Sequence, residues 1–434
     1  MARQQKAYNQ RHLCEHGLMA AEPVSATLRW SMVAIALTVT ASAFSFINAV
    51  PFMIPALEAA RGTELAEAGL LSAMPSLGMV VTLIAWGYVA DRIGERTVLV
   101  IGSALTALSG FAAASVNSLV ATGALLFLGG MAAASCNPAC GRLVAGWFPA
   151  HQRGLAMGVR QTAQPLGIAM GALMIPRLAE HRPSLGLLFP ASACAVSAVV
   201  GALIAHDPPR KPSTTASGAE LVNPYRGTTV LWRIHTVSAL MVMPQSMTVT
   251  FMLVWLTGNH GWSVRAAGAL VTTTQLLGAL TRIAAGRWSD RVGSRMRPVR
   301  IVAVATSLTL LMLSLANQLD SPLAVGFMVL VSVVTVMDNG LEATAITEFA
   351  GQFWSGRALG VQNTTQRLMI LAVPPAFGAM IMAGGYPLAF ALCGLFPLAA
   401  APLVPVGLLA PDVEDREAEH SLGRLPRKAV QARD

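Results

Sequence analysis

Apolar residues run along this chain in long blocks that short polar segments separate. The blocks have the length of about 20 residues that an α-helix needs to cross the hydrocarbon of a bilayer. The alternating ten-residue segments typical of a membrane β-barrel are not seen in the sequence. The pattern predicts an all-α polytopic membrane protein with twelve transmembrane helices, over residues 31–57, 66–90, 97–116, 119–146, 154–178, 185–205, 230–257, 265–288, 299–316, 322–349, 357–382 and 386–409.

The basic residues gather in every second polar segment. If the chain starts on the inner side, the inner segments hold 22 Lys and Arg residues, the outer segments hold 4, and 4 lie inside the predicted spans. Basic residues are enriched in the cytoplasmic loops of membrane proteins. The distribution predicts a multi-pass protein of the cytoplasmic membrane with both termini in the cytoplasm. It also accounts for the net charge of +9 without a nucleic-acid partner.

The composition excludes several classes of protein. Hydrophobic residues make up 54% of the chain and charged residues 12%, against about 25% charged in soluble domains, which argues against a soluble enzyme or a disordered chain. No ATP-binding loop and no hydrolase or metalloprotease motif is present in the sequence, so we expect no enzyme activity. The spacing of Cys136 and Cys140 indicates packing rather than a metal site, because no histidine lies nearby. We expect no cofactor and no metal.

The two halves of the sequence resemble each other. Gly87, Asp91, Arg92, Gly94 and Arg96 align with Gly286, Asp290, Arg291, Gly293 and Arg295 at an offset of 199 residues. Asn137, Gly154, Gly158 and Gln164 align with Asn339, Gly356, Gly360 and Gln366 at an offset of 202. The repeat predicts two pseudo-symmetric six-helix bundles. We expect an N-terminal arm at 1–28, bundles at 29–205 and 230–409, a cytoplasmic linker at 206–229 and a tail at 410–434.

These motifs resemble a known family. The two G-x-x-x-D-R-x-G-x-R segments are similar to the signature loops of the major facilitator superfamily, whose secondary transporters consist of two parallel halves. The phrase from Val159 to Gly167 is also similar to the fifth helix of cyanate-transporter-like porters. The proton-driven drug exporters of the superfamily commonly carry an arginine where this chain has Leu125. The resemblance therefore implies a twelve-helix secondary transporter. The absence of the exporters' arginine argues against drug export.

Two acids are predicted to lie deep in the membrane. Asp338 and Glu342 are four residues apart in the tenth span and share one helix face, and Glu348 follows near the inner end; the first half is expected to hold no such acid. Two carboxylates this close do not both ionise easily, which suits a proton carrier. The alternative is a salt bridge that only fixes this helix. We name Asp338 and Glu342 as candidate proton-coupling residues.

Four arginines also lie inside the predicted spans. One interpretation is that Arg160, Arg282 and Arg367 bind an anionic substrate, because a guanidinium binds carboxylates in a bidentate manner. The other is that they only balance the acids of the tenth span. Arg142 lies near the inner end of the fourth span, where its side chain can instead extend to the surface.

Uncharged polar residues add candidate substrate contacts. The resemblance implies that the first, fourth, seventh and tenth helices line the cavity. Asn48, Gln164 and Gln245 are the candidates we retain, because a buried amide needs several hydrogen-bond partners. Serine and threonine residues of the first and seventh spans more often bond between helices.

The repeated loops predict a gate on the cytoplasmic side. We expect Asp91 to meet the start of the eleventh helix near Arg357, and Asp290 to meet the start of the fifth near Arg153, since an acid is favourable at a helix N-terminus. The alternative is that both aspartates only cap short loops. The gating candidates are Gly87, Asp91, Arg92, Gly94, Arg153, Gly286, Asp290, Arg291, Gly293 and Arg357.

Together these features predict a secondary active transporter that works by alternating access. We expect a monomer in the lipid bilayer that moves a small organic anion or polar metabolite with protons, as a symporter or an antiporter. The alternative is proton-driven efflux of lipophilic drugs, although aromatic residues are only 6% of the chain. A membrane-embedded enzyme and a non-transporting receptor are the remaining classes.

Overall fold

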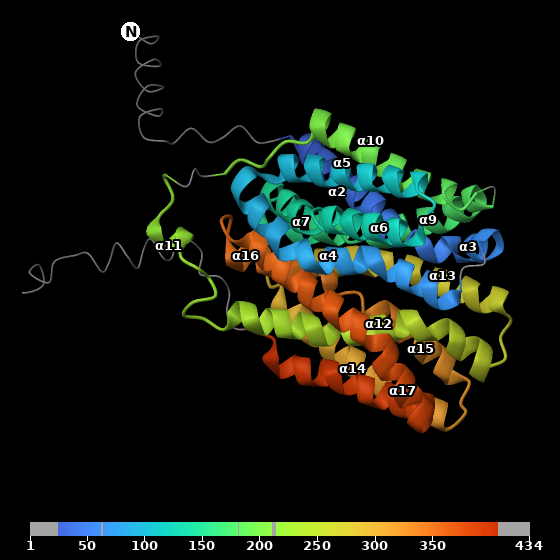
Figure 1. Cartoon of the computed structure of the whole chain (residues 1–434). Coiled ribbons are helices and arrows are strands. Elements are labelled where there is room, and N and C mark those ends of the chain that lie inside the picture. The colour runs from blue at the N-terminus through green and yellow to red at the C-terminus, as the bar shows by residue number, and fades with distance from the viewer. Residues whose placement is uncertain (1–24, 62–63, 181, 211–213, 407–434) are drawn as a thin grey trace, which may run out of the picture.

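The computed structural model describes residues 25–61, 64–180, 182–210 and 214–406. Most of the predicted N-terminal arm, and the tail from residue 407, lie outside the described residues. The described part of the chain consists of helices and connecting segments without a β-strand. The helices lie side by side in one elongated bundle, with the first half of the chain above the second in Figure 1.

The first half contains six spans, several of them in more than one piece. The elements are α2 (Ala26–Ile47), η1 (Val50–Met53), α3 (Ile54–Arg61), α4 (Leu65–Ile93), α5 (Glu95–Ser115), α6 (Leu119–Ala133), α7 (Cys136–Trp147), α8 (Ala150–Arg160), α9 (Ala163–Ala179) and α10 (Leu185–Ile204). The first span therefore ends at Ile47, ten residues before the predicted boundary. Asn48 caps α2, and Pro51 begins the short helix that follows.

The second half repeats this arrangement. After the short linker helix α11 (Gly218–Leu221) come α12 (Val230–Asn259), α13 (Val264–Val292), α14 (Met296–Gln318), α15 (Leu323–Val334), α16 (Asn339–Ala350) and α17 (Ser355–Leu403). The last element holds the two final spans, which turn at Gly385, where φ is 74°. The twelve predicted spans thus correspond to an all-α fold of two six-helix bundles.

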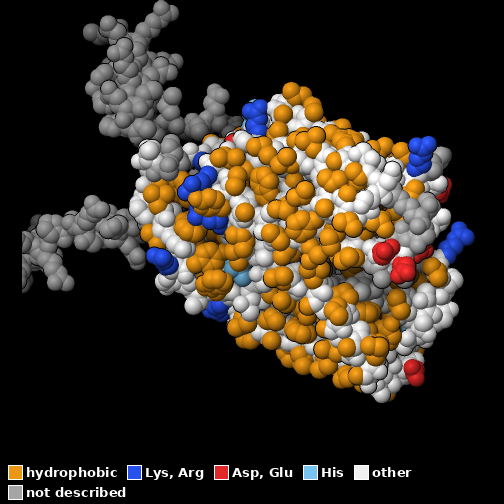
Figure 2. Space-filling model, in the orientation of Figure 1, with side chains coloured by type: hydrophobic (Ala, Val, Ile, Leu, Met, Phe, Trp, Pro, Cys, Tyr) orange, Lys and Arg blue, Asp and Glu red, His pale blue; other side chains and the backbone are white. Residues whose placement is uncertain are grey.

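Nine helices of the described chain are long and apolar enough to cross a membrane by length and composition alone. The difference from twelve has three causes. The fifth span is cut into α8 and α9, α13 is more polar than the other spans, and α17 contains two spans. Large apolar side chains such as Val81, Leu280 and Met382 are exposed on the outside of the bundle, where lipid would cover them (Figure 2).

Two of the helices that enter the centre of the molecule are interrupted next to a proline. The regular α-helix is interrupted at Ala134–Ser135 between α6 and α7, although both residues keep helical backbone angles, and Pro138 lacks the N–H that would bond to the carbonyl of Ala134. Pro165 has the same relation to Gln161 at the junction of α8 and α9. The break between α6 and α7 therefore lies just before Pro138. Such breaks place polar backbone and side chains inside the bundle.

The two halves touch along two seams that the repeat relates. In one seam α4 packs against the first part of α17, and Gly87 faces Gly356. In the other, α13 packs against α8, and Gly286 faces Gly154. A Cβ atom on any of these four glycines would overlap the backbone of the opposite helix. The seams therefore depend on glycine, which lets two backbones approach directly.

We predict that Gly286→Val separates the seam between α8 and α13. The valine must displace the backbone of Gly154, and such overpacking costs about 1–3 kcal/mol. Asn363 lines a polar cavity between the two halves. In a background without native cysteines, Asn363→Cys should then react faster with an impermeant thiol reagent from the linker side.

Gly268→Val is the matched control, because Gly268 lies on the same helix and has open space where a Cβ would be. Equal reaction rates in the two valine variants would contradict the role given to the seam.

Candidate functional site

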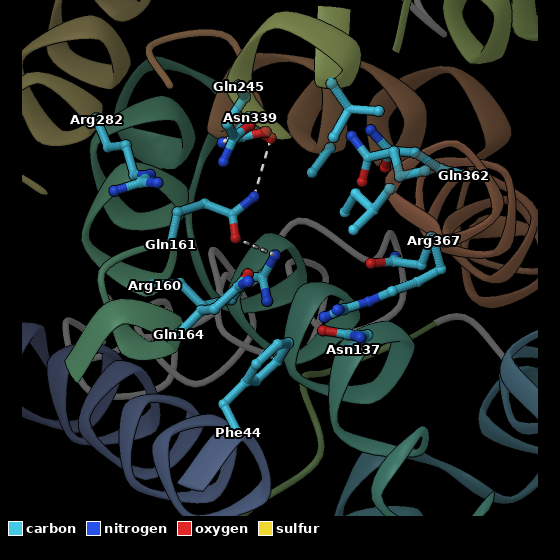
Figure 3. A pocket seen from close by; sticks show the side chains of 15 residues that line it. Phe44, Asn137, Arg160, Gln161, Gln164, Gln245, Arg282, Asn339, Gln362 and Arg367 are labelled. Atoms are coloured by element: carbon cyan, nitrogen blue, oxygen red, sulfur yellow. Dashed lines mark hydrogen bonds between the residues drawn. The ribbon is translucent and has the colours of Figure 1, made fainter. Parts of the chain in front are cut away.

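A polar cavity lies between the two halves near the middle of the bundle (Figure 3). Its volume is about 60 Å³. Phe44 of α2 and Val242 and Gln245 of α12 line it, together with residues of α7 and α16. The expected contributions of the first, fourth, seventh and tenth helices are thus present. The fifth, eighth and eleventh helices also line the cavity, and they carry its three arginines.

The three candidate arginines meet in this cavity. Arg160 ends α8, Arg282 comes from α13 and Arg367 from the first part of α17. Arg160 and Arg282 are buried, and the guanidinium of Arg367 lies 5.0 Å from the centre of the Phe44 ring. Among the described residues, none of the three is within ion-pair distance of an acid. The arginines therefore hold positive charge in a site that is largely shielded from water.

The cavity wall consists mainly of carboxamides. They are Asn137, Gln161, Gln164, Gln245, Asn339, Gln362, Asn363 and Gln366. Gln161 donates to the carbonyl of Asn339 at 2.9 Å, which links the two halves, and Asn339 donates to Gln245 at 3.1 Å. Amides both donate and accept hydrogen bonds, so this wall can bind a polar solute in several orientations.

The candidate amides have different outcomes. The structure brings Gln164 and Gln245 to the cavity. Asn48 does not reach it, because its side chain donates to the carbonyl of Phe44 at 2.8 Å and caps α2. The other cavity amides were not candidates, although the repeat carried a signal for them. Asn137 and Asn339 are repeat partners, as are Gln164 and Gln366, and all four line the same cavity.

The two candidate proton-coupling acids lie behind the cavity wall. Glu342 is fully buried and accepts a hydrogen bond from Ser238, and Gln362 donates to the same carboxylate oxygen at 3.4 Å. Gln362 and Gln366 also donate to Ser238, at 3.0 and 2.9 Å. The hydrogen-bond partners of Glu342 among the described residues are therefore neutral side chains, and no ion pair of this part of the chain includes Glu342. Gln362 touches both the acid and the cavity.

Asp338 connects this acid to the arginines. It directly precedes α16 and is buried. Its nearest charged neighbours are Glu342 and Arg282, and no ion pair within 4 Å forms between Asp338 and an arginine of the described chain. Each acid has one buried carboxylate oxygen, and Arg282 one buried guanidinium nitrogen, without a hydrogen-bond partner among the residues that the structure describes. A proton on either acid would therefore change the charge directly beside the cavity.

The gating candidates form two clusters at the end of the bundle where the linker lies. Asp91 accepts hydrogen bonds from the backbone N–H groups of Gly356 and Arg357 at 2.8 and 3.1 Å, and from the Arg357 side chain at 2.8 Å. Asp290 accepts from the N–H groups of Gly154 and Leu155 at 3.0 and 2.8 Å. Each aspartate thus occupies the helix start at which the sequence places it.

The arginine partners differ from the expectation in the second cluster. Arg295, not Arg153, pairs with Asp290, at 2.6 Å. Arg153 instead pairs with Glu348 at 3.1 Å and donates to carbonyls at the end of α7. The Arg153 side chain points back along the loop that precedes α8. A sequence repeat does not reveal the direction of a side chain. Arg92 and Arg291 lie on the surface outside both clusters.

The first cluster contains an acid that the sequence analysis missed. Glu95 begins α5, is completely buried, and bonds to Arg142 at 2.7 Å and to Arg210 of the linker. Arg142 also pairs with Asp91, and its side chain is buried, so it does not extend to the surface. The predicted spans leave Glu95 in the polar segment between 90 and 97, whereas only Gly94, with a φ of 89°, separates α4 from α5. Gly293 allows the corresponding turn with a φ of 64°.

The linker binds both halves at this end. Asp207 accepts a hydrogen bond from the N–H of Arg96 at 2.8 Å at the start of α5. Further along, the Tyr225 hydroxyl lies 2.9 Å from Nε2 of His235 in α12. Burial raises the pKa of Tyr225 to about 12, so its phenol stays protonated and neutral. Figure 2 shows Lys and Arg side chains gathered at the same end.

Two repeat-related helix bundles around a central polar cavity define a membrane transport protein. A family profile of the Major Facilitator Superfamily matches residues 35–374. An uncharacterized MFS-type transporter of Mycobacterium tuberculosis is 61% identical over 406 residues, which cover 94% of this chain and 91% of that protein. The chain belongs to the Major Facilitator Superfamily.

More distant proteins share the fold. A cis,cis-muconate transport protein of Acinetobacter baylyi is 22% identical over 367 residues, 80% of this chain and 88% of that protein. The solved structure of a proton:xylose symporter matches with a TM-score of 0.70 and 16% identity, over 87% of this chain and 95% of that chain. A human organic anion transporter matches with a TM-score of 0.67 and 17% identity, over 86% of this chain and 98% of that chain. At these identities the structures show the fold alone.

We predict that Asp91→Asn opens the linker end. The amide cannot accept hydrogen bonds on both atoms as the carboxylate does, and it leaves the buried Arg142 with fewer acidic partners. The Asn363→Cys reporter should become at least about tenfold more reactive from the linker side, which corresponds to about 1.4 kcal/mol.

Asp320→Asn is the control, because Asp320 is exposed and lies in a turn away from both clusters. If a folded Asp91→Asn protein reacts at the wild-type rate, the gating role of Asp91 is wrong.

Proposed function

We propose that this protein is a secondary transporter that moves a small organic anion together with protons across the cytoplasmic membrane by alternating access. The observation that carries the proposal is that none of the three cavity arginines forms an ion pair with an acid in the described part of the chain. Unpaired charges in a low-dielectric site are costly, so an arginine without a partner is favourable only if a ligand supplies the negative charge.

The size of the cavity favours this over the efflux of lipophilic drugs. Sites for drug-sized ligands commonly occupy roughly 300–1,000 Å³ and have mostly apolar walls. This cavity measures about 60 Å³, and arginines and amides make up most of its wall. The dimensions fit a few waters or one small polar solute.

The position of the acids supports proton coupling. Glu342 bonds to Gln362, which also lines the cavity, and Asp338 has both Glu342 and Arg282 as charged neighbours. We propose that Glu342 carries the proton and that Asp338 shares in its binding. The anion neutralises the arginines and the proton neutralises the acid, so that the loaded site has little net charge. Closing the cavity over a neutral site costs less free energy than closing it over a charged one. The movement of the anion is therefore coupled to the movement of the proton.

The names of several relatives agree with an anionic substrate. One is the cis,cis-muconate transport protein. Two others are probable anion transporters of plants, and these two match only 28% and 41% of this chain. The sequence similarity to cyanate-transporter-like porters points to the same kind of substrate and remains a prediction.

We further propose that the linker end faces the cytoplasm. Basic residues gather there, as is typical of cytoplasmic loops. Both gate clusters are closed at this end, so the structure would represent a state in which the cytoplasmic side is shut. Opening would break the contacts of Asp91 and Asp290 while the central amides change partners.

We predict that Glu342→Gln uncouples transport from protons. The glutamine keeps the size of the side chain and can still bond to Ser238 and Gln362, but it does not take up a proton. In proteoliposomes, accumulation of labelled succinate driven by a pH gradient should fall at least about tenfold, while exchange of internal for external succinate should stay within about threefold of wild type.

Glu67→Gln provides the control, because Glu67 is exposed in the first turn of α4. Full proton-driven accumulation in Glu342→Gln would show that this acid does not carry the proton.

A further inference from the structure

The two halves have opposite chemistry at equivalent positions. The repeat offset of 202 that aligns Asn137 with Asn339 also aligns Cys136 with Asp338 and Cys140 with Glu342. It aligns Arg160 with Gln362 in the same way. In the second half, Gln362 bonds to Glu342. The first half therefore has buried thiols where the second has acids, and an arginine where the second has an amide.

This exchange leaves Arg160 without a countercharge. The buried thiols of Cys140 and Cys136 are among its ionisable neighbours. Its only hydrogen bond among the described residues runs to Gln161 at 3.3 Å, and its Nε atom is buried without a partner. An acid at position 140 would have been placed to neutralise this guanidinium. A thiol leaves the charge available to a ligand.

Arg367 is the second cation without an acid. It comes from the other half, lies over the ring of Phe44, and is near Cys136, as Arg160 is. Figure 3 shows both guanidinium groups extending into the same part of the cavity beside Asn137. The Nδ2 atom of Asn137 is buried there without a hydrogen-bond partner. Arg282 differs from these two because Asp338 is its charged neighbour.

We infer that the substrate is a small dicarboxylate whose two charges are neutralised by Arg160 of one half and Arg367 of the other. The inference rests on the proposed function and narrows its substrate class. A singly charged anion would leave one guanidinium unbalanced when the cavity closes. The amides that continue from these arginines across the cavity suit an extended molecule with two separate acceptor groups better than a compact dianion such as phosphate.

The first test measures substrate selectivity in proteoliposomes. Labelled succinate should be transported, and unlabelled succinate should compete at least about tenfold better than butyrate or inorganic phosphate. Arg160→Gln should remove most of this preference for succinate over butyrate, because one of the two charges is then no longer recognised.

The second test uses a pair of variants that differ in charge alone. Cys140→Glu should reduce succinate transport at least about tenfold, since the new carboxylate would pair with Arg160. Cys140→Gln introduces a neutral side chain of nearly the same size as glutamate. Its succinate transport should stay within about threefold of wild type. Equal losses in both variants would contradict the inference.

The results separate the inference from the function on which it rests. If butyrate or phosphate is transported at the same rate as succinate, the protein remains an anion transporter and the dicarboxylate assignment is wrong. If no anion is bound or transported, the proposed function is wrong as well.

Discussion

Direct backbone contact between glycines of the two halves is the constraint on which the rest of this structure depends. Gly87 meets Gly356, and Gly154 meets Gly286, in two seams that the internal repeat relates. This approach is what brings Asp91 and Asp290 within hydrogen-bond distance of the helix starts across each seam. One turn further along, Gly158 and Gly360 still face the opposite backbone, and the cavity begins beyond them. The same contacts thus close one end and define where the cavity starts.

The seams are built so that they can be broken. Their polar contacts lie at the end of the bundle, and Arg153, Glu348 and Arg357 remain partly exposed. Ion pairs in such places contribute about 0–1 kcal/mol each, so they bias an equilibrium instead of fixing it. The two clusters are not equal, however. The cluster around Asp91 includes the completely buried Glu95 and Arg142 and is tied to the linker through Arg210. We expect this cluster to be the harder one to open.

The sequence predicts the fold better than the site. Long apolar blocks and the repeat are enough for twelve helices in two halves, because the bilayer imposes both the length and the apolar character of each span. Glu95 was missed because a helix boundary that is wrong by two residues turns a buried acid into a loop residue. The partner of Asp290 was wrong because the path of a long arginine side chain depends on its neighbours. Asn48 looked like a site residue, but it lies beyond Phe44 at the C-terminal end of α2, and its side chain bonds to the Phe44 carbonyl instead of reaching the cavity.

The cavity amides show what a more complete use of the repeat would have found. Asn137 and Asn339 were aligned from the sequence, yet only their meeting in one cavity reveals a shared role. The same alignment pairs Cys140 with Glu342, and this contrast has meaning only once Arg160 and Gln362 are known to lie beside them. The two halves therefore have similar helices but different charged side chains at equivalent positions. In the proposed function, this difference gives the two halves different tasks. Under this proposal, both halves provide an arginine for the substrate, and the second half also provides the acid for the proton.

The most direct test of this account is to follow protons and substrate together. Succinate would be added outside proteoliposomes that contain a trapped pH indicator, with the membrane potential held at zero and no initial pH difference. The account predicts that the interior acidifies as succinate enters, and that neither change occurs in liposomes without the protein. Entry of succinate without any change in internal pH would contradict the coupling of the two halves through one cavity.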